Sequence, residues 1–202
     1  MHRNPVLLIH GILVQARVFR RMANYLTRSG WDVHALNLTP HLGEVGIDEL
    51  AVQIADYIDK NFTTKQTIDI VGFSMGGIVS RYYIQRLEGI KKVQRFISIS
   101  APHYGTKMAY LLNSPGCLQM RPDSPFLADL NRDVAMLAKL NFTSIWTPWD
   151  FVIVPANSSK MPVGKEVKLS VVIHGLMTRH PATIKAVAEA LREPFKPYHL
   201  PD

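Results

Sequence analysis

Short apolar runs alternate along the chain with longer stretches in which apolar residues recur at a helical spacing. The runs, which are rich in β-branched residues and typical of buried strands, are Val6–Ile9, Val33–Leu36, Ile68–Val71, Phe96–Ser100, Thr143–Trp146 and Val167–Ile173. Helices are predicted at Arg17–Ser29, Ile47–Asn61, Ser74–Leu87 and Thr183–Arg192. This alternation predicts an α/β fold with a mostly parallel six-stranded sheet and helices on both faces.

One segment, from about residue 102 to residue 141, interrupts the alternation. It separates two predicted strands by about forty residues, far more than an ordinary connection between a strand and a helix. Two short helices are predicted inside it, at Thr106–Leu112 and at Ser124–Asn131 with Pro125 in the first position. Because no repeat, linker or polar tract divides the chain, we expect a single domain over residues 1–202 with a cap-like insert.

Composition limits the class of protein. The chain has 202 residues, 47% of them hydrophobic, which is enough to bury one sizeable core. Its one cysteine, Cys117, excludes an intramolecular disulfide, and a small residue in a loop is the simpler interpretation of it than a catalytic thiol. The first apolar run, Val6–Ile9, is too short for a signal sequence or a membrane span, so a cytoplasmic location is the default expectation.

The chain is basic, with a formal net charge of +7. Its basic residues, among them Arg17, Arg20, Arg21 and Arg81, are scattered and form neither an arm nor a known nucleic-acid module, so no nucleic-acid partner is expected. The charge serves solubility in the first place, and a transient attraction to an anionic membrane surface is the second interpretation. The sequence does not determine an oligomeric state.

The strongest chemical signal follows the predicted strand Ile68–Val71, where Gly72-Phe73-Ser74-Met75-Gly76 leads into a helix. A Ser on such a sharp turn has a strained backbone, and the positions two before and two after it need Gly because a Cβ would collide with a neighbouring strand or helix. A helix N-terminus also stabilises negative charge. We therefore predict that Ser74 is a nucleophile, whereas a Gly-rich turn with a capping Ser is the alternative.

A second signal lies at the end of the first predicted strand, in His10-Gly11-Ile12. Acyl transfer needs two N–H donors for the oxyanion, one from the residue after the nucleophile and one from the loop after an adjacent strand. Met75 and Ile12 are the candidates. Gly11 allows a close backbone approach, and we expect His10 to brace this loop by a hydrogen bond; a role as general base is the alternative.

The carboxylate and the base should follow the nucleophile along the chain, in the order Ser, Asp, His. Asp150 lies just past the predicted strand Thr143–Trp146 and is favoured; surface charges or caps account for Asp123, Asp129 and Asp133.

For the base, His174 directly follows the predicted strand Val167–Ile173, at the sheet edge where Ser74 must lie. His180 precedes Pro181, the expected first residue of the last helix, and suits a position beside a helix cap. We favour His174.

These motifs resemble a known family. The stretches that carry the resemblance are residues 10–12, 72–83, 100–106 and 146–155. With them the chain resembles the α/β-hydrolases, and within that superfamily the class 2 lipases and the minimal bacterial lipases. The resemblance implies Ser74 as nucleophile, Asp150 as acid and His174 as base, with the N–H groups of Ile12 and Met75 as oxyanion hole.

The resemblance also bears on the finer assignments. Many relatives have a Pro seven residues after the catalytic His, as Pro181 follows His174, although many also have a Gly before that His, where this chain has Gly175 after it. The stretch 100–106 is similar to segments of true lipases and of inositol deacylases; a tight turn using Pro102 and Gly105 is the alternative interpretation.

The predicted function is a serine carboxylic-ester hydrolase, a lipase or esterase that forms an acyl-enzyme on a small-molecule or lipid ester. An acyl-thioesterase with the same triad and a noncatalytic hydrolase-like binding protein are the alternatives. No cofactor or metal is expected, since no His, Cys or Asp cluster has ligand spacing. Candidates for contact with an acyl chain, which otherwise pack the insert against the body, are Met108, Leu111, Leu112, Met120 and Phe126.

Overall fold

A single parallel sheet forms the centre of the molecule. The computed structural model describes residues 3–196. The strands are β1 (Val6–Ile9), β2 (Val33–Leu36), β3 (Ile68–Phe73), β4 (Val93–Ile99), β5 (Asn141–Trp146) and β6 (Lys165–Lys168). They pair in the order β2-β1-β3-β4-β5-β6, and every pair is parallel. The predicted fold class, an α/β fold with a six-stranded parallel sheet, is confirmed.

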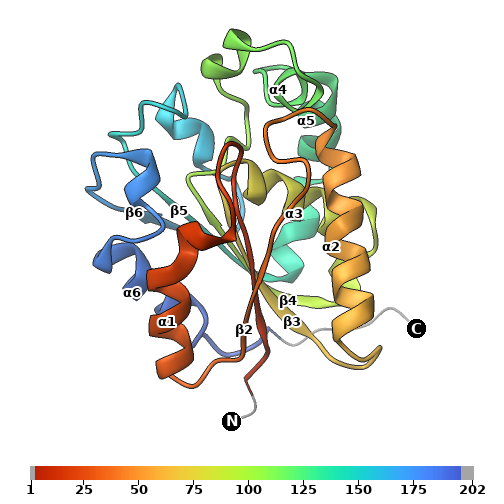
Figure 1. The fold of residues 1–202 in the computed structure, drawn as a ribbon, viewed down its shortest axis with the longest axis vertical. Helices are drawn as coiled ribbons and strands as arrows, with labels where there is room; N and C mark the ends of the chain where they lie inside the picture. Colours follow the sequence, from red (N-terminus) through yellow and green to blue (C-terminus); the bar gives the residue numbers. More distant parts are fainter. Residues whose placement is uncertain (1–2, 197–202) are drawn as a thin grey trace.

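Helices cover both faces of this sheet (Figure 1). On one face lie α1 (Arg20–Arg28) and α6 (Pro181–Ala190), and on the other α2 (Ile47–Asn61) and α3 (Met75–Arg86). Because side chains alternate along a strand, β1 sends Leu7 and Ile9 into the core under α2 and α3, and Val6 and Leu8 into the core under α1 and α6. A strand buried on both faces has no polar side, which is why β1 is a continuous apolar run.

The predicted insert contains more helix than the sequence indicated. It holds α4 (Pro115–Gln119) and α5 (Pro125–Arg132), which lie beyond the sheet edge at the top of Figure 1. The predicted helix at Thr106–Leu112 is a 3-10 helix, and α4 was not predicted at all. Cys117, expected in a loop, lies buried in α4. The 3-10 helices are Ala16–Phe19, Gly89–Lys91, Lys107–Leu111, Val134–Lys139, Ala156–Ser159 and His174–Leu176.

The last strand was placed wrongly. It was predicted at Val167–Ile173, but β6 ends at Lys168, and Val172 and Ile173 are largely exposed. The physical reason is the length of the neighbouring strand: β5 ends at Trp146, whose carbonyl accepts the N–H of Leu169, and beyond it there is no strand to pair with. His174 therefore lies six residues after the strand end, at the start of a 3-10 helix, and not directly after the strand.

None of the helices between residues 3 and 196 is both long enough and apolar enough to cross a bilayer.

Candidate active site

Ser74 occupies a strained turn between β3 and α3. Its backbone has φ 54° and ψ −127°, a left-handed conformation that is unfavourable for a residue with a Cβ. The surroundings hold it there. The Ser74 N–H donates to the Ile99 carbonyl at 2.8 Å, and the Ser74 carbonyl accepts the N–H of Gly77 at 2.9 Å. The strand before the turn and the helix after it together fix the Ser74 hydroxyl at the carboxyl edge of the sheet.

The two glycines that flank the turn are required by contact. A Cβ on Gly72 would lie 2.7 Å from the Gly76 carbonyl oxygen, and a Cβ on Gly76 would run into the carbonyls of Ile9 and His10. Because these are backbone atoms, no side chain can move aside. The spacing Gly-x-Ser-x-Gly is therefore dictated by the close approach of β1, β3 and α3.

The loop after β1 packs directly against the serine. A Cβ on Gly11 would lie 2.9 Å from the Ser74 Cβ, so glycine is what allows this loop to approach. Ile12, the next residue, lines the same pocket as Ser74. Met75 is the first residue of α3, where an N–H has no partner within the helix. Among residues 3–196 neither the Ile12 nor the Met75 N–H has a protein acceptor, so both are free to bind an oxyanion.

His10 holds this loop in place. Its Nδ1 lies 2.8 Å from the Gly11 carbonyl oxygen, and its Nε2 accepts the Leu38 N–H at 2.9 Å. With both ring nitrogens engaged, His10 is the neutral tautomer that carries its proton on Nδ1. Burial lowers the pKa of His10, which favours the neutral ring. The bonds are those of a brace, and neither nitrogen is available to act as a base for Ser74.

Asp150 and His174 come together from two loops at the same edge of the sheet. The His174 Nδ1 donates to Asp150 Oδ2 at 2.7 Å, while Asp150 Oδ1 accepts the N–H groups of Val152 and Ile153, both at 2.9 Å. Burial alone would raise the pKa of Asp150, but the bond from His174 and these two N–H groups lower it below its usual value. Asp150 is therefore an ionised carboxylate that orients the imidazole.

The His174 ring lies beside the nucleophile turn. It packs against the ring of Phe73, the residue before Ser74, with 4.8 Å between ring centroids and an angle of 35° between the ring planes. His180 is used differently: it is the N-cap of α6, and its Nδ1 accepts the Ala182 N–H at 3.2 Å. Of the two histidines considered from the sequence, the structure brings His174 to Asp150 and leaves His180 at a helix end.

The rival carboxylates lie elsewhere. Asp129 and Asp133 both contact Arg86 at the end of α3, each with a nitrogen to oxygen distance of 2.8 Å. These are surface ion pairs that fasten the insert to α3.

An apolar pocket of about 210 Å³ lies between Ser74 and the insert. Four of the predicted contact residues line it: Met108, Leu111, Leu112 and Met120. Leu111 is 71% exposed and Leu13 63% exposed, so the pocket is open to solvent at its rim. Such a lining suits an acyl chain that ends at the Ser74 hydroxyl.

Phe126, the fifth predicted contact residue, does not line this pocket. It lies on α5 and its ring stacks on Tyr82 with 5.4 Å between centroids, packing the insert against α3. Sequence reasoning also missed lining residues: Val152 and Ile153 belong to the loop after Asp150, and Cys117 to α4. The sequence indicated these residues only by their position, next to Asp150 or inside the insert.

The chain matches one family model and many solved structures. The model, described as palmitoyl protein thioesterase, matches residues 5–147, a range that includes Ile12, Ser74 and Met75 and ends before Asp150 and His174. Aspergillus fumigatus lipase B is 18% identical with a TM-score of 0.79; the match covers 96% of this chain and 53% of the lipase, so the chain spans about half of that protein.

Two further structures match over nearly their full length. The mature form of a Bacillus licheniformis lipase is 14% identical with a TM-score of 0.77, and the match covers 94% of this chain and 92% of that one. A bromoperoxidase from Bacillus anthracis is 17% identical with a TM-score of 0.72, covering 95% and 93%. At these identities the structures establish a shared fold and no more.

Proposed function

The chain belongs to the palmitoyl protein thioesterase family, and we propose that it is a serine hydrolase that cleaves acyl esters through Ser74, His174 and Asp150. The observation that carries the proposal is the hydrogen bond from His174 Nδ1 to Asp150 Oδ2 at 2.7 Å, with the His174 ring packed on the residue before a strained serine. A buried carboxylate, an oriented imidazole and a serine hydroxyl on a strained turn are the parts that nucleophilic acyl transfer requires.

The first half of the reaction forms an acyl-enzyme. Ser74 Oγ attacks the carbonyl carbon of the substrate while its proton passes to His174 Nε2, and the Nδ1 proton stays on the bond to Asp150. The N–H groups of Ile12 and Met75 bind the negative oxygen of the tetrahedral intermediate. Collapse of that intermediate breaks the bond to the leaving group, which departs with the proton from His174 Nε2.

The second half returns the enzyme to its starting state. Water gives a proton to His174 Nε2 and attacks the acyl carbon, and the same two N–H groups bind the second oxyanion. Breakage of the bond to Ser74 Oγ releases the acid, and the proton on His174 returns to the serine. Asp150 stays ionised throughout and stabilises the imidazolium.

The apolar pocket favours an acyl chain as the part of the substrate that it binds. Its lining from the insert and from Val152 and Ile153 is almost free of polar groups other than Ser74 and Thr106. An acyl chain placed there would have its carbonyl carbon at the serine. We therefore propose a carboxylic ester with an aliphatic acyl group as the substrate class.

A thioester is the second candidate, and the family match favours it. The same residues would perform both reactions, because a thiolate leaves with the proton from His174 as an alkoxide does. Matched oxygen and sulfur esters with the same acyl chain separate the two: a higher kcat/KM on the thioester would assign the enzyme to thioesters.

Covalent labelling tests whether the chain is an enzyme at all. A fluorophosphonate probe should label the wild type and should not label Ser74→Ala, because the probe reacts only with an activated serine. Ser170→Ala, which removes an exposed serine in the loop before His174, should be labelled like the wild type. An unlabelled wild type would instead favour a noncatalytic binding protein, and a folded, labelled Ser74→Ala would move the nucleophile elsewhere.

A further inference from the structure

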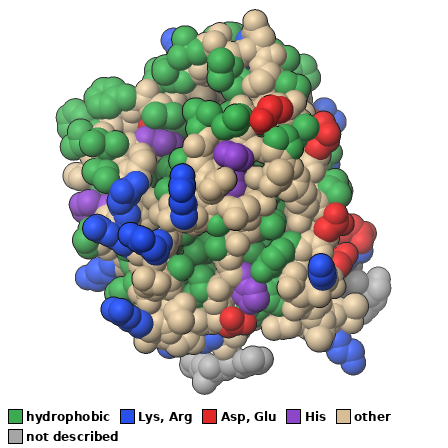
Figure 2. Space-filling model, in the orientation of Figure 1, with side chains coloured by type: hydrophobic (Ala, Val, Ile, Leu, Met, Phe, Trp, Pro, Cys, Tyr) green, Lys and Arg blue, Asp and Glu red, His purple; other side chains and the backbone are tan. Residues whose placement is uncertain are grey.

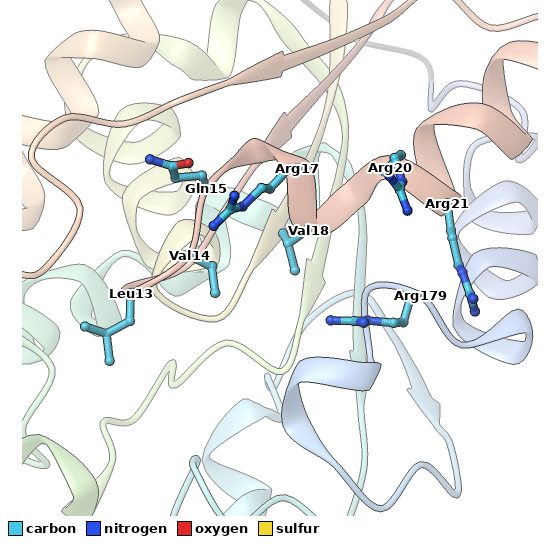
Figure 3. A pocket seen from close by; sticks show the side chains of 8 residues that line it. All are labelled: Leu13, Val14, Gln15, Arg17, Val18, Arg20, Arg21 and Arg179. Carbon is cyan, nitrogen blue, oxygen red and sulfur yellow. The ribbon is translucent and has the colours of Figure 1, made fainter.

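A second hollow, of about 430 Å³, lies beside the candidate active site and is strongly basic. Four arginines line it, Arg17, Arg20, Arg21 and Arg179, together with Gln15 and Leu13. Figure 3 shows the four side chains around one open space, three from the start of the α1 region and Arg179 from the loop before α6. Basic side chains gather on the same side of the molecule in Figure 2. We call this hollow the arginine pocket.

The charges of the arginine pocket are not compensated. Within the described part of the chain, none of its four guanidinium groups has a carboxylate or another acceptor as partner. Arg86 and Arg95 differ from these four, because each of them is paired with an aspartate. Like charges gathered in one hollow repel one another, and a bound anion offsets this electrostatic repulsion. Guanidinium groups bind phosphate in particular, by paired hydrogen bonds.

The arginine pocket borders both catalytic loops. Leu13 lines it and the apolar pocket alike, and it follows Ile12, whose N–H we assign to the oxyanion. On the other side, Arg179 belongs to the turn that begins with His174: the His174 carbonyl accepts the Met177 N–H, and the Leu176 carbonyl accepts the Arg179 N–H, both at 3.0 Å. The arginine pocket therefore adjoins the apolar pocket at Leu13 and the His174 turn at Arg179.

The chemistry assigns one half of the substrate to each pocket. His174 must give its proton to the leaving group, so the leaving group lies on the side of the His174 turn, which carries Arg179. The acyl chain lies on the opposite side, in the apolar pocket. We propose that the arginine pocket binds a phosphate group on the alcohol or thiol half of the substrate, an inference that rests on the proposed acyl hydrolysis.

Matched substrate pairs test this inference. Octanoyl-coenzyme A and S-octanoyl-N-acetylcysteamine have the same thioester, but only the first carries phosphate. Octanoyl-glycerol 3-phosphate and monooctanoylglycerol form the same comparison for an oxygen ester. The wild type should prefer the phosphate-bearing member of at least one pair in kcat/KM, and the preferred pair identifies the source of the phosphate.

Variants of the pocket arginines test whether the preference for phosphate-bearing substrates arises in the arginine pocket. Arg17→Gln and Arg179→Gln should each lower kcat/KM on the preferred phosphate-bearing substrate by about tenfold or more, since each loses a charge-assisted hydrogen bond. Their kcat/KM on the neutral partner should stay within about twofold of the wild type. Arg28→Gln, an exposed arginine at the far end of α1, is the control and should change neither.

Each other outcome has a definite meaning. If the wild type cleaves none of the four substrates, the proposed function fails before the arginine pocket is tested. If it cleaves the neutral substrates without preferring phosphate, this inference is wrong and the proposed function stands. Sedimentation with phosphatidylglycerol and phosphatidylcholine vesicles measures binding to anionic and neutral membranes. If Arg17→Gln and Arg179→Gln lose binding to the anionic vesicles but keep wild-type kinetics on all four substrates, the arginine pocket is a membrane contact and the proposal is overturned.

Discussion

At the scale of single residues, His174 and His180 differ in what their ring nitrogens bind. His174 Nδ1 is engaged by Asp150. In the proposed mechanism His174 Nε2 is the atom that exchanges protons with Ser74. His180 Nδ1 accepts the Ala182 N–H and thereby caps α6. On the proposed mechanism the two histidines therefore have separable roles, one in the reaction and one in the stability of a helix.

Alanine variants of both residues should show this separation. His174→Ala removes the proton acceptor and should lower kcat by about a thousandfold or more while the protein unfolds at nearly the same urea concentration. His180→Ala removes an N-cap and should cost about 1 kcal/mol of unfolding free energy with kcat nearly unchanged. Steady-state kinetics and urea unfolding on the same preparations measure both. The reverse pattern would transfer the role of base to His180.

Local geometry made some site residues predictable and left others hidden. Gly72, Ser74 and Gly76 follow from the steric demands of one turn, which a sequence displays directly. Asp150 and His174 meet only because two loops end at the same sheet edge, so the sequence could rank them but not pair them. Phe126 shows the limit: an apolar residue of the insert can face either the pocket or the body, and the Phe126 ring packs on Tyr82 of α3. The arginine pocket was hidden because Arg179 joins it from the other end of the chain.

At the scale of elements, a side-chain hydrogen bond from Thr147 replaces strand pairing beyond the ends of β5 and β6. Thr147 follows β5 and is fully buried. Its hydroxyl donates to the Val171 carbonyl at 2.8 Å, at a point where the segments that follow β5 and β6 no longer pair as strands. Val171 lies three residues before His174. The Thr147 hydroxyl thus holds the segment that leads to His174.

Thr147→Val should therefore affect both stability and turnover. The substitution keeps the shape but leaves the Val171 carbonyl without its donor, which should cost about 1–3 kcal/mol of unfolding free energy. Because the His174 segment is then held less firmly, kcat should fall about tenfold with little change in KM. Thr147→Ser keeps the hydroxyl and should retain kcat. Equal kcat values in the two variants would show that this bond does not position His174.

The ends of some elements are marked by their own residues, whereas the ends of others depend on a partner strand. β1, β2 and α2 were predicted residue for residue, because turn residues or polar residues mark both of their ends. β6 was not, since the length of a strand depends on its partner, and the apolar residues 171–173 resemble a strand although β5 has already ended. The helix α4 was missed because five residues give no periodic pattern.

At the scale of the whole molecule, two buried histidines link folding to pH. His10 and His103 are both completely inaccessible to solvent. Burial lowers the pKa of each, and for His103 the nearby buried Arg81 lowers it further. Asp69 acts in the opposite direction, because burial raises its pKa to about 6 despite the bonds from Arg95 and Asn4. The pH dependence of stability is therefore a balance, and single variants are needed to resolve it.

His103→Gln should make unfolding less sensitive to acid. Below about pH 6.5 the unfolded chain binds a proton at residue 103 that the folded protein does not, so acidification favours unfolding by about 1.4 kcal/mol per pH unit for this residue alone. Urea unfolding at pH 7.5, 6 and 5 should give His103→Gln a slope that is shallower than that of the wild type by about this amount. Ser98→Ala removes the hydroxyl bonded to His103 Nε2 but no titrating group, so it should keep the wild-type slope. Parallel curves for His103→Gln and the wild type would mean that His103 binds protons equally in both states, contrary to its burial.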